Sequence, residues 1–167
     1  MVIEKESFHI DMSGRIYEGK NIGIALVGAR TRTHYGCALK GNLIKLIKKR
    51  LFGKKIFEDS AKLYSICIYL LIKNVTQNIN LLIICNDENF EVVKIILLKL
   101  LKNPNFEIIN ISEFRKRLGR NIGSLADNYA NIYRKRALSP NRWSKGRELN
   151  VVPVNFTLIE KHWEELK

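Results

Sequence analysis

Among the acidic residues of this 167-residue sequence, those at four separate places have a type and spacing that could support metal chemistry. Carboxylate oxygens are hard ligands, which magnesium and manganese prefer. Three or four carboxylates from different elements can hold two such ions about 3.5–4 Å apart, which neutralises the attacking and leaving oxygens when a phosphodiester is cleaved. Because like charges repel, acids gathered at one point are best explained by a bound cation. The candidate residues are Asp11, Glu58 or Asp59, Asp87 and Asp127.

Each acid also has a purely structural interpretation, because short polar side chains commonly satisfy N–H groups in turns and at helix starts. Asp11 could bond the turn that follows it, and Asp59 and Asp87 could cap the helices after them. Ser124 and Asp127 have the spacing of a capping box. Taken singly, these structural roles are the more common ones. Taken together, three aspartates on three elements favour a shared site.

Basic and aromatic residues form a second group, which suits contact with a nucleic-acid backbone. Lysine and arginine neutralise phosphates, and aromatic rings stack on bases. They gather in the segments 40–55, 113–120 and 134–147. The alternative for the first segment is an ordinary solvated helix face. The candidate contact residues are Lys45, Lys48, Lys49, Arg50, Arg134, Lys135, Arg142, Trp143 and Lys145.

The strands that must position these residues follow from the hydrophobic periodicity. Three N-terminal strands are joined by loops too short for a crossover, so we expect an antiparallel meander. A later strand, helix and strand have the spacing of a βαβ unit, whose strands are parallel. The predicted strands are 7–12, 21–29, 33–39, 78–85 and 106–111, with an edge strand at 151–156.

Helical periodicity fills the segments between and after these strands. One helix, after the N-cap pair Asp59-Ser60, is apolar nearly all round and should be buried. Another carries the basic residues of the segment 40–55 around an apolar stripe. The predicted helices are 42–52, 61–72, 90–101, 112–120, 125–137 and 157–167.

This order of elements resembles the ribonuclease H-like fold that ribonuclease H, retroviral integrases, many transposases and Holliday junction resolvases share. The resemblance covers about residues 7–137 of a single α/β domain, 1–167, which ends in a basic loop and C-terminal extension at 138–167. It implies a mixed sheet, an antiparallel meander plus parallel strands, flanked by helices. It also implies that the first and fourth strands are parallel neighbours.

Individual residues carry the resemblance further. The DMSG sequence at Asp11 looks like the first-strand setting that the family favours, and Asp87 follows the fourth strand. Asp127, in LADNYANIYRKR, looks like the late-helix A-D-x-x-A pattern of ribonucleases H. The resemblance implies that these three aspartates are catalytic and that they, with Glu58, hold magnesium or manganese. The expected activity is metal-dependent cleavage of phosphodiester bonds in DNA or RNA.

The sequence departs from the family at one place, and this departure favours a different function. Ribonucleases H carry a glutamate inside the first central helix, whereas the interior of the corresponding helix, 61–71, has no acid here. A non-catalytic, basic α/β module that binds nucleic acid or ribonucleoprotein is therefore the alternative. Convergence of Asp11, Asp87 and Asp127 at one point would favour the nuclease.

The composition of the chain indicates which partners and which cellular compartment to expect. The chain has 29 Lys and Arg against 16 Asp and Glu, a net charge of +13, which most simply indicates a nucleic-acid partner. Hydrophobic residues make up 46%, enough to bury a core, and no apolar run approaches the roughly 20 residues of a membrane helix. Three cysteines without a CxxC pair favour a reducing compartment. We expect a cytoplasmic protein without membrane association. A homodimer is one alternative for its oligomeric state.

Overall fold

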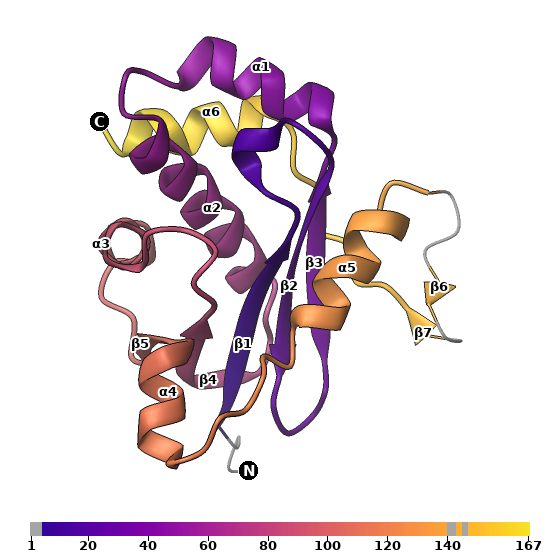
Figure 1. Ribbon diagram of the computed structural model, residues 1–167, viewed down its shortest axis with the longest axis vertical. Helices are drawn as coiled ribbons and strands as arrows, with labels where there is room; N and C mark the ends of the chain where they lie inside the picture. Colours follow the sequence, from indigo (N-terminus) through magenta and orange to yellow (C-terminus); the bar gives the residue numbers. More distant parts are fainter. Residues whose placement is uncertain (1–4, 140–142, 145–146) are drawn as a thin grey trace.

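A mixed five-stranded sheet forms the centre of the protein (Figure 1). The computed structural model describes residues 5–139, 143–144 and 147–167. The strand order is β3-β2-β1-β4-β5, so the first strand lies in the middle of the sheet. The five strands are β1 (Lys5–Ser13), β2 (Ile22–Gly28), β3 (His34–Leu39), β4 (Asn78–Ile84) and β5 (Glu107–Asn110). A separate two-stranded ribbon pairs β6 (Trp143–Ser144) with β7 (Arg147–Glu148).

The strand directions confirm the predicted α/β fold class. β1, β2 and β3 form an antiparallel meander, and β1, β4 and β5 are parallel. β1 and β4 are neighbours, with Ile10 opposite Ile84, so both strands end at the same edge of the sheet. This order and these directions are consistent with a ribonuclease H-like topology. The βαβ crossover predicted between β4 and β5 is present.

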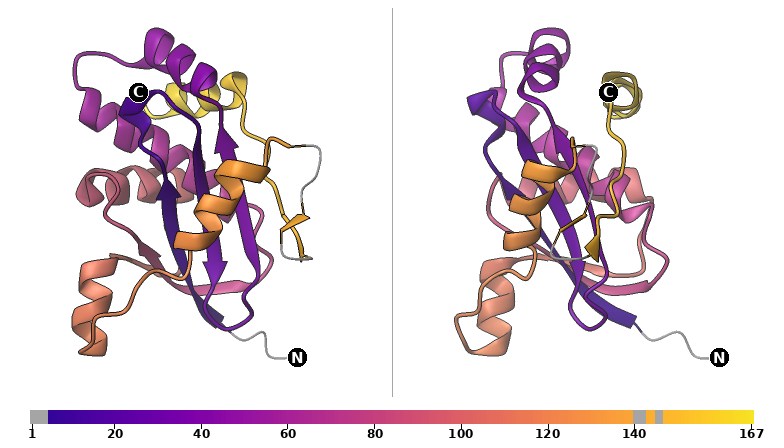
Figure 2. Two further views of the ribbon diagram at one scale, coloured as in Figure 1. Left: turned by 45° about the vertical axis from the view of Figure 1, so that its right-hand side comes forward. Right: turned by 90° about the vertical axis from the view of Figure 1, so that its right-hand side faces the viewer.

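Helices cover both faces of the sheet (Figure 2). α5 lies across β1, β2 and β3 on one face, and α2, with α3 and α6 beside it, covers the other. α4 follows β5 directly, and a single 3-10 turn, η1 (Ile16–Glu18), follows β1. The helices are α1 (Gly41–Leu51), α2 (Ile56–Ile72), α3 (Phe90–Leu101), α4 (Ile111–Leu118), α5 (Asp127–Arg136) and α6 (Phe156–Glu165).

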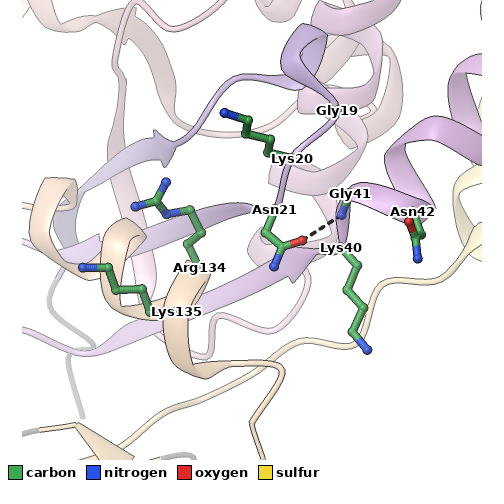
Figure 3. A pocket seen from close by; sticks show the side chains of 8 residues that line it. All are labelled: Gly19, Lys20, Asn21, Lys40, Gly41, Asn42, Arg134 and Lys135. Carbon is green, nitrogen blue, oxygen red and sulfur yellow. Dashed lines mark hydrogen bonds between the residues drawn. The ribbon is translucent and has the colours of Figure 1, made fainter.

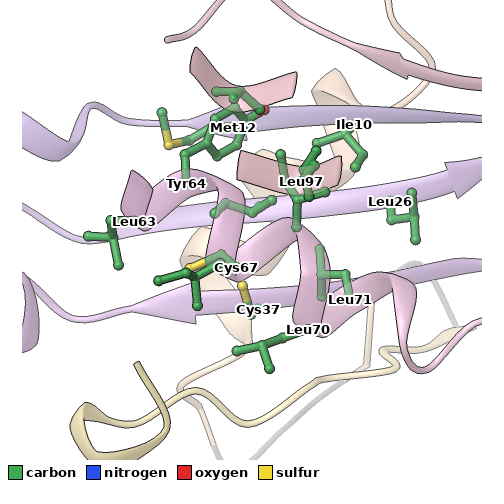
Figure 4. Close-up of a cluster of buried hydrophobic side chains, with 14 of the residues drawn as sticks. Ile10, Met12, Leu26, Cys37, Leu63, Tyr64, Cys67, Leu70, Leu71 and Leu97 are labelled. Atoms are coloured by element: carbon green, nitrogen blue, oxygen red, sulfur yellow. The ribbon is translucent and has the colours of Figure 1, made fainter. Parts of the chain in front are cut away.

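The main core lies between the sheet and α2, as the apolar sequence of that helix predicts (Figure 4). The α2 residues Leu63, Tyr64 and Cys67 are fully buried there. Cys67 packs close to Cys37 of β3, and both cysteines are free thiols. No helix in the described part of the chain is long and apolar enough to cross a membrane.

A second, smaller core lies under α5 and depends on two glycines. A side chain at Gly23 of β2 would collide with the α5 backbone at Ala130 and Arg134. A side chain at Gly36 of β3 would collide with the ring of Tyr133. The two glycines therefore let α5 lie directly on the sheet, which fixes the position of every residue that the helix carries.

Two predictions about element bounds are wrong. α2 begins at Ile56, one turn earlier than expected, and Asp59 lies inside its first turn instead of capping it. The predicted edge strand at 151–156 is absent, and only one bridge joins Val151 to Gly36. Pro153 has no N–H with which to continue a ladder, and Asn155 then caps α6.

Candidate metal centre

Asp11 and Asp87 come together at the edge where β1 and β4 end. The two carboxyl groups are hydrogen-bonded to each other. The backbone N–H of Met12 donates to both, at 2.8 Å to Asp11 Oδ1 and 3.3 Å to Asp87 Oδ2. The parallel pairing of β1 with β4 explains this meeting, because it places the residues after Ile10 and after Ile84 side by side.

The electrostatics of the pair are those of two acids crowded together. Partial burial raises the pKa of Asp11 above its usual value of 3.8. Asp87 is an exposed residue, but desolvation of its carboxyl group beside Asp11, and then the hydrogen bond to Asp11, raise its pKa to about 8. Without a cation the pair therefore shares a proton at neutral pH, since two neighbouring carboxylates cannot both ionise cheaply.

Asp127 lies at the margin of the pair. It is the first residue of α5, and its charge is close enough to Asp11 to raise the pKa of that group. Asp127 itself is exposed and makes no hydrogen bond to either carboxyl group that the structure records. Cys85 bonds both Asp11 and Ser124, which ties the end of β4 to the segment before α5. Two of the predicted aspartates are thus in direct contact, and the third is nearby.

The capping roles that could have explained these acids belong to other residues. Asn89, not Asp87, caps α3, because its side chain accepts the N–H groups of Glu91 and Val92. No side chain caps the start of α5, and the Ser124 hydroxyl accepts the Ala126 N–H instead. Only the turn-bonding role expected for Asp11 is present, through Met12, and it leaves the rest of the carboxyl group for Asp87.

The acids at the start of α2 point to other partners. Glu58 is exposed and pairs with Lys55 at 3.9 Å. The carboxyl group of Asp59 accepts the Gly53 N–H at 2.7 Å, so it holds the α1–α2 loop. Neither Glu58 nor Asp59 is among the groups whose charges shift the pKa values of Asp11 and Asp87.

Tyr64 is the α2 residue that approaches the pair. Its side chain is fully buried, and the charges of Asp87 and Asp11 add to burial in raising its pKa. Its hydroxyl has no hydrogen-bond partner within the described part of the structure. A buried hydroxyl without a partner costs about 1–3 kcal/mol, so this one marks a position where a further polar group is expected.

A cleft of about 760 Å³ opens beside Asp87. Glu88 lines it, and partial burial raises the pKa of Glu88 to about 7. Two aromatic rings on its walls are unusually exposed, Phe57 at 77% and Tyr17 at 52%. Arg15 bonds the Tyr17 hydroxyl at 2.7 Å. None of these four residues is predicted as a site residue from the sequence, because they come from separate segments that meet only in the folded chain.

The predicted basic contact residues lie on several surfaces. Three of the α1 side chains are exposed, while Lys48 is half-buried, and desolvation lowers its pKa. Arg134 and Lys135 line a separate pocket at the C-terminal half of α5. Trp143 is 53% exposed in β6, and its carbonyl accepts a bond from Arg136 at 3.0 Å. Arg142 and Lys145 lie outside the described residues.

Comparisons with known proteins give no further indication of what this chain does. No family model, no curated protein and no solved structure matches this chain. Within the described residues, no group of three or more His, Cys, Asp and Glu side chains is arranged to hold a metal ion. The candidate centre is therefore a pair of carboxyl groups, Asp11 and Asp87, with Asp127 and Glu88 beside it.

Proposed function

We propose that this protein is a metal-dependent nuclease of the ribonuclease H-like type, which hydrolyses phosphodiester bonds in DNA or RNA. The observation that carries the proposal is the contact between Asp11 and Asp87 at the common end of β1 and β4. Two acids that repel each other without a cation are most simply explained as ligands of one. Asp127 adds a third negative charge to the same region.

The donor set fits magnesium or manganese. Its atoms are carboxylate oxygens, and magnesium is usually bound by one or two carboxylates together with waters and substrate phosphates. Asp11 and Asp87 would hold the ion, and Asp127 or Glu88 would approach it through water. When bound, such ions neutralise charge on the attacking and leaving oxygens of the phosphodiester. The unpartnered hydroxyl of Tyr64 suits a hydrogen bond beneath this centre.

The cleft beside the carboxyl groups suits a nucleic-acid strand. Arg15 supplies a positive charge at its wall and lies over the Tyr17 ring, 5.9 Å from the ring centroid, while the Phe57 side chain is largely exposed to solvent. Bases stack on exposed aromatic rings with about 1–3 kcal/mol each, and duplexes hide the base faces that would do so. The cleft therefore favours substrates with unpaired bases near the cleaved bond, such as single strands or branched junctions.

The second candidate function is binding of nucleic acid without cleavage. It is favoured by the absence of an acid in the interior of α2, where the residue that approaches the pair is Tyr64. In that case the carboxyl groups would be a relic or a purely structural pair, and the positive charge of the chain would account for binding alone.

Cleavage of a labelled panel tests the proposal. The panel holds a single strand, a duplex, an RNA–DNA hybrid and a four-way junction, each incubated with magnesium, with manganese and with EDTA. We expect metal-dependent cleavage of at least one substrate by the wild type and its loss in Asp11→Asn, because the amide keeps the shape but removes the ligand charge. The matched control is Glu58→Gln, which removes an exposed acid of α2 and should retain activity. No cleavage of any substrate by the wild type would favour the binding module.

A further inference from the structure

A second hollow, of about 620 Å³, is lined by positively charged residues (Figure 3). Four cationic residues are among those that line it: Lys20 before β2, Lys40 after β3, and Arg134 and Lys135 from α5. No carboxylate is among its described lining residues. A pocket with four cations and no acid selects for an anion by charge alone.

The walls of this cationic pocket are fixed by close backbone contact. Gly19 and Gly41 meet so tightly that a side chain at Gly41 would collide with the Gly19 carbonyl oxygen. The Asn21 side chain accepts the Gly41 N–H at 2.8 Å, which joins the start of β2 to the start of α1 (Figure 3). The lysines at positions 20 and 40 are thus held on one rim by rigid backbone.

The opposite rim is held by α5. The Arg134 guanidinium donates to Asn131 Oδ1 at 2.9 Å, so its position is set by a neighbour on its own helix. None of the four cations forms an ion pair with a carboxylate in the described part of the chain. Like charges gathered without counter-charges repel, and a bound anion would relieve that cost.

The same face of α5 connects the cationic pocket to the carboxyl groups. Asp127, Asn131 and Arg134 are four and three residues apart, the spacing of one helix face. Asn131 also lies 3.5 Å from the Ser13 hydroxyl at the end of β1. Seven residues of helix advance about 10 Å, which separates the acidic end of this face from its basic end.

We propose that the cationic pocket binds a backbone phosphate of a nucleic-acid strand whose next contacts are at the carboxyl groups. Because the two ends of this helix face are about 10 Å apart, the bound phosphate lies within a few nucleotides of the carboxyl groups. Phosphate binding is inferred from the lining of the pocket alone. The spacing between the bound phosphate and a cleaved bond rests on the proposed function.

Binding in EDTA tests the pocket without any need for cleavage. The pocket variant is Lys40→Gln with Lys135→Gln, and the control is Lys99→Gln with Lys161→Gln on α3 and α6, across the sheet from α5. Both lose two positive charges. Fluorescence anisotropy of a labelled single strand across about 50–200 mM salt gives the affinity and its salt dependence.

We expect the pocket variant to bind about 10- to 30-fold more weakly at 0.1 M salt, with a log–log salt slope shallower by about 0.7, since the pocket holds one phosphate and each lost phosphate contact removes about 0.7. The control should keep the wild-type slope. Equal losses in both variants would mean that only net charge matters, and an unchanged pocket variant would mean that no phosphate is bound there. Either result would overturn the proposal.

A single neutral methylphosphonate, moved along the strand, locates the phosphate. Wild-type binding should weaken when the neutral linkage occupies the pocket, and the pocket variant should be indifferent at that same position. Indifference of the wild type at every position would also refute the pocket. If the pocket variant loses binding while the wild type cleaves nothing, the phosphate site stands and the nuclease proposal fails alone.

Discussion

At the scale of single residues, the centre depends on how two carboxyl groups share their protons. Asp87 has a pKa of about 8, whereas an unperturbed aspartate has a pKa near 3.8. Glu88 has a pKa of about 7 and behaves in the same way. The folded protein therefore binds more protons than the unfolded chain across this range, and its free energy of unfolding falls as the pH rises.

We predict that, in EDTA, stability falls between pH 6.5 and 8. His9 has the opposite effect, because burial lowers its pKa to about 4, but its influence ends at its ordinary value of 6.5. Urea unfolding across this window measures the slope. Magnesium or manganese should raise stability more at pH 8 than at pH 6.5, and Asp11→Asn should flatten the pH dependence. Stability that rises with pH in this window would contradict the description of the pair.

Phe57 offers a second test at this scale. Because its ring is 77% exposed, Phe57→Ala should change the free energy of unfolding by no more than about 0.5 kcal/mol. Loss of a stacking surface should weaken binding of single strands by about 1–3 kcal/mol and leave duplex binding nearly unchanged. Ile95→Ala, at a 55% exposed position on α3, is the control. Equal effects of both variants on single-strand binding would exclude a stacking role for Phe57.

At the scale of elements, α5 is the part that links the acidic and basic surfaces. It carries Asp127 at its first turn and Arg134 near its end, and it lies on β2 through Gly23. The sequence predicts this helix by its periodicity, but nothing local shows how closely it approaches the sheet. That closeness is a tertiary property, set by a glycine on another element.

Gly23→Ala should move α5 outward. The added methyl group would collide with the backbone at Ala130 and Arg134, which cannot rotate away as a side chain would. We expect a loss of about 1–3 kcal/mol in the free energy of unfolding, measured by urea, and weaker nucleic-acid binding. Gly123→Ala is the control, because no atom lies within 4 Å of the position its methyl group would take. If Gly23→Ala left the free energy of unfolding unchanged, this would show that α5 packs less closely against β2 than described above.

The elements also show where prediction from sequence succeeds and fails. The five strands of the sheet and the buried helix α2 follow from periodicity, because one face or all faces of each must be apolar. The segment at 151–156 is apolar for another reason. Val152 and Phe156 pack against the core from a chain that bonds β3 at only one point. A segment that is buried without pairing has the same apolar composition as an edge strand, so composition alone predicts the wrong structure for it.

At the scale of the whole molecule, the net charge of +13 is the most general indication of a partner. We predict that nucleic-acid binding weakens steeply with salt, because neutralised phosphates release their counterions. Anisotropy titrations at several salt concentrations measure the slope, with a polyanion such as heparin as a competitor. Weak binding at low salt, or an affinity indifferent to salt, would contradict a role for the basic surface.

The arrangement of the whole sheet explains which site residues were predictable. Asp11 and Asp87 were, because parallel neighbouring strands bring their ends together. Glu88, Tyr17 and Phe57 were not, since they reach the cleft from three segments that become neighbours only in the folded chain. Sequence order predicts where strands end, while the walls of a cleft depend on the packing of all the layers.

If the proposed function holds, Asp11 and Asp87 act together as a cation site. Titration with manganese, followed by electron paramagnetic resonance of the free ion, measures this binding directly at pH 8, close to the pKa of Asp87. We predict saturable binding by the wild type, strong loss in both Asp11→Asn and Asp87→Asn, and unchanged binding in Glu58→Gln. Absence of binding by the wild type, or equal binding by Asp87→Asn, would contradict it.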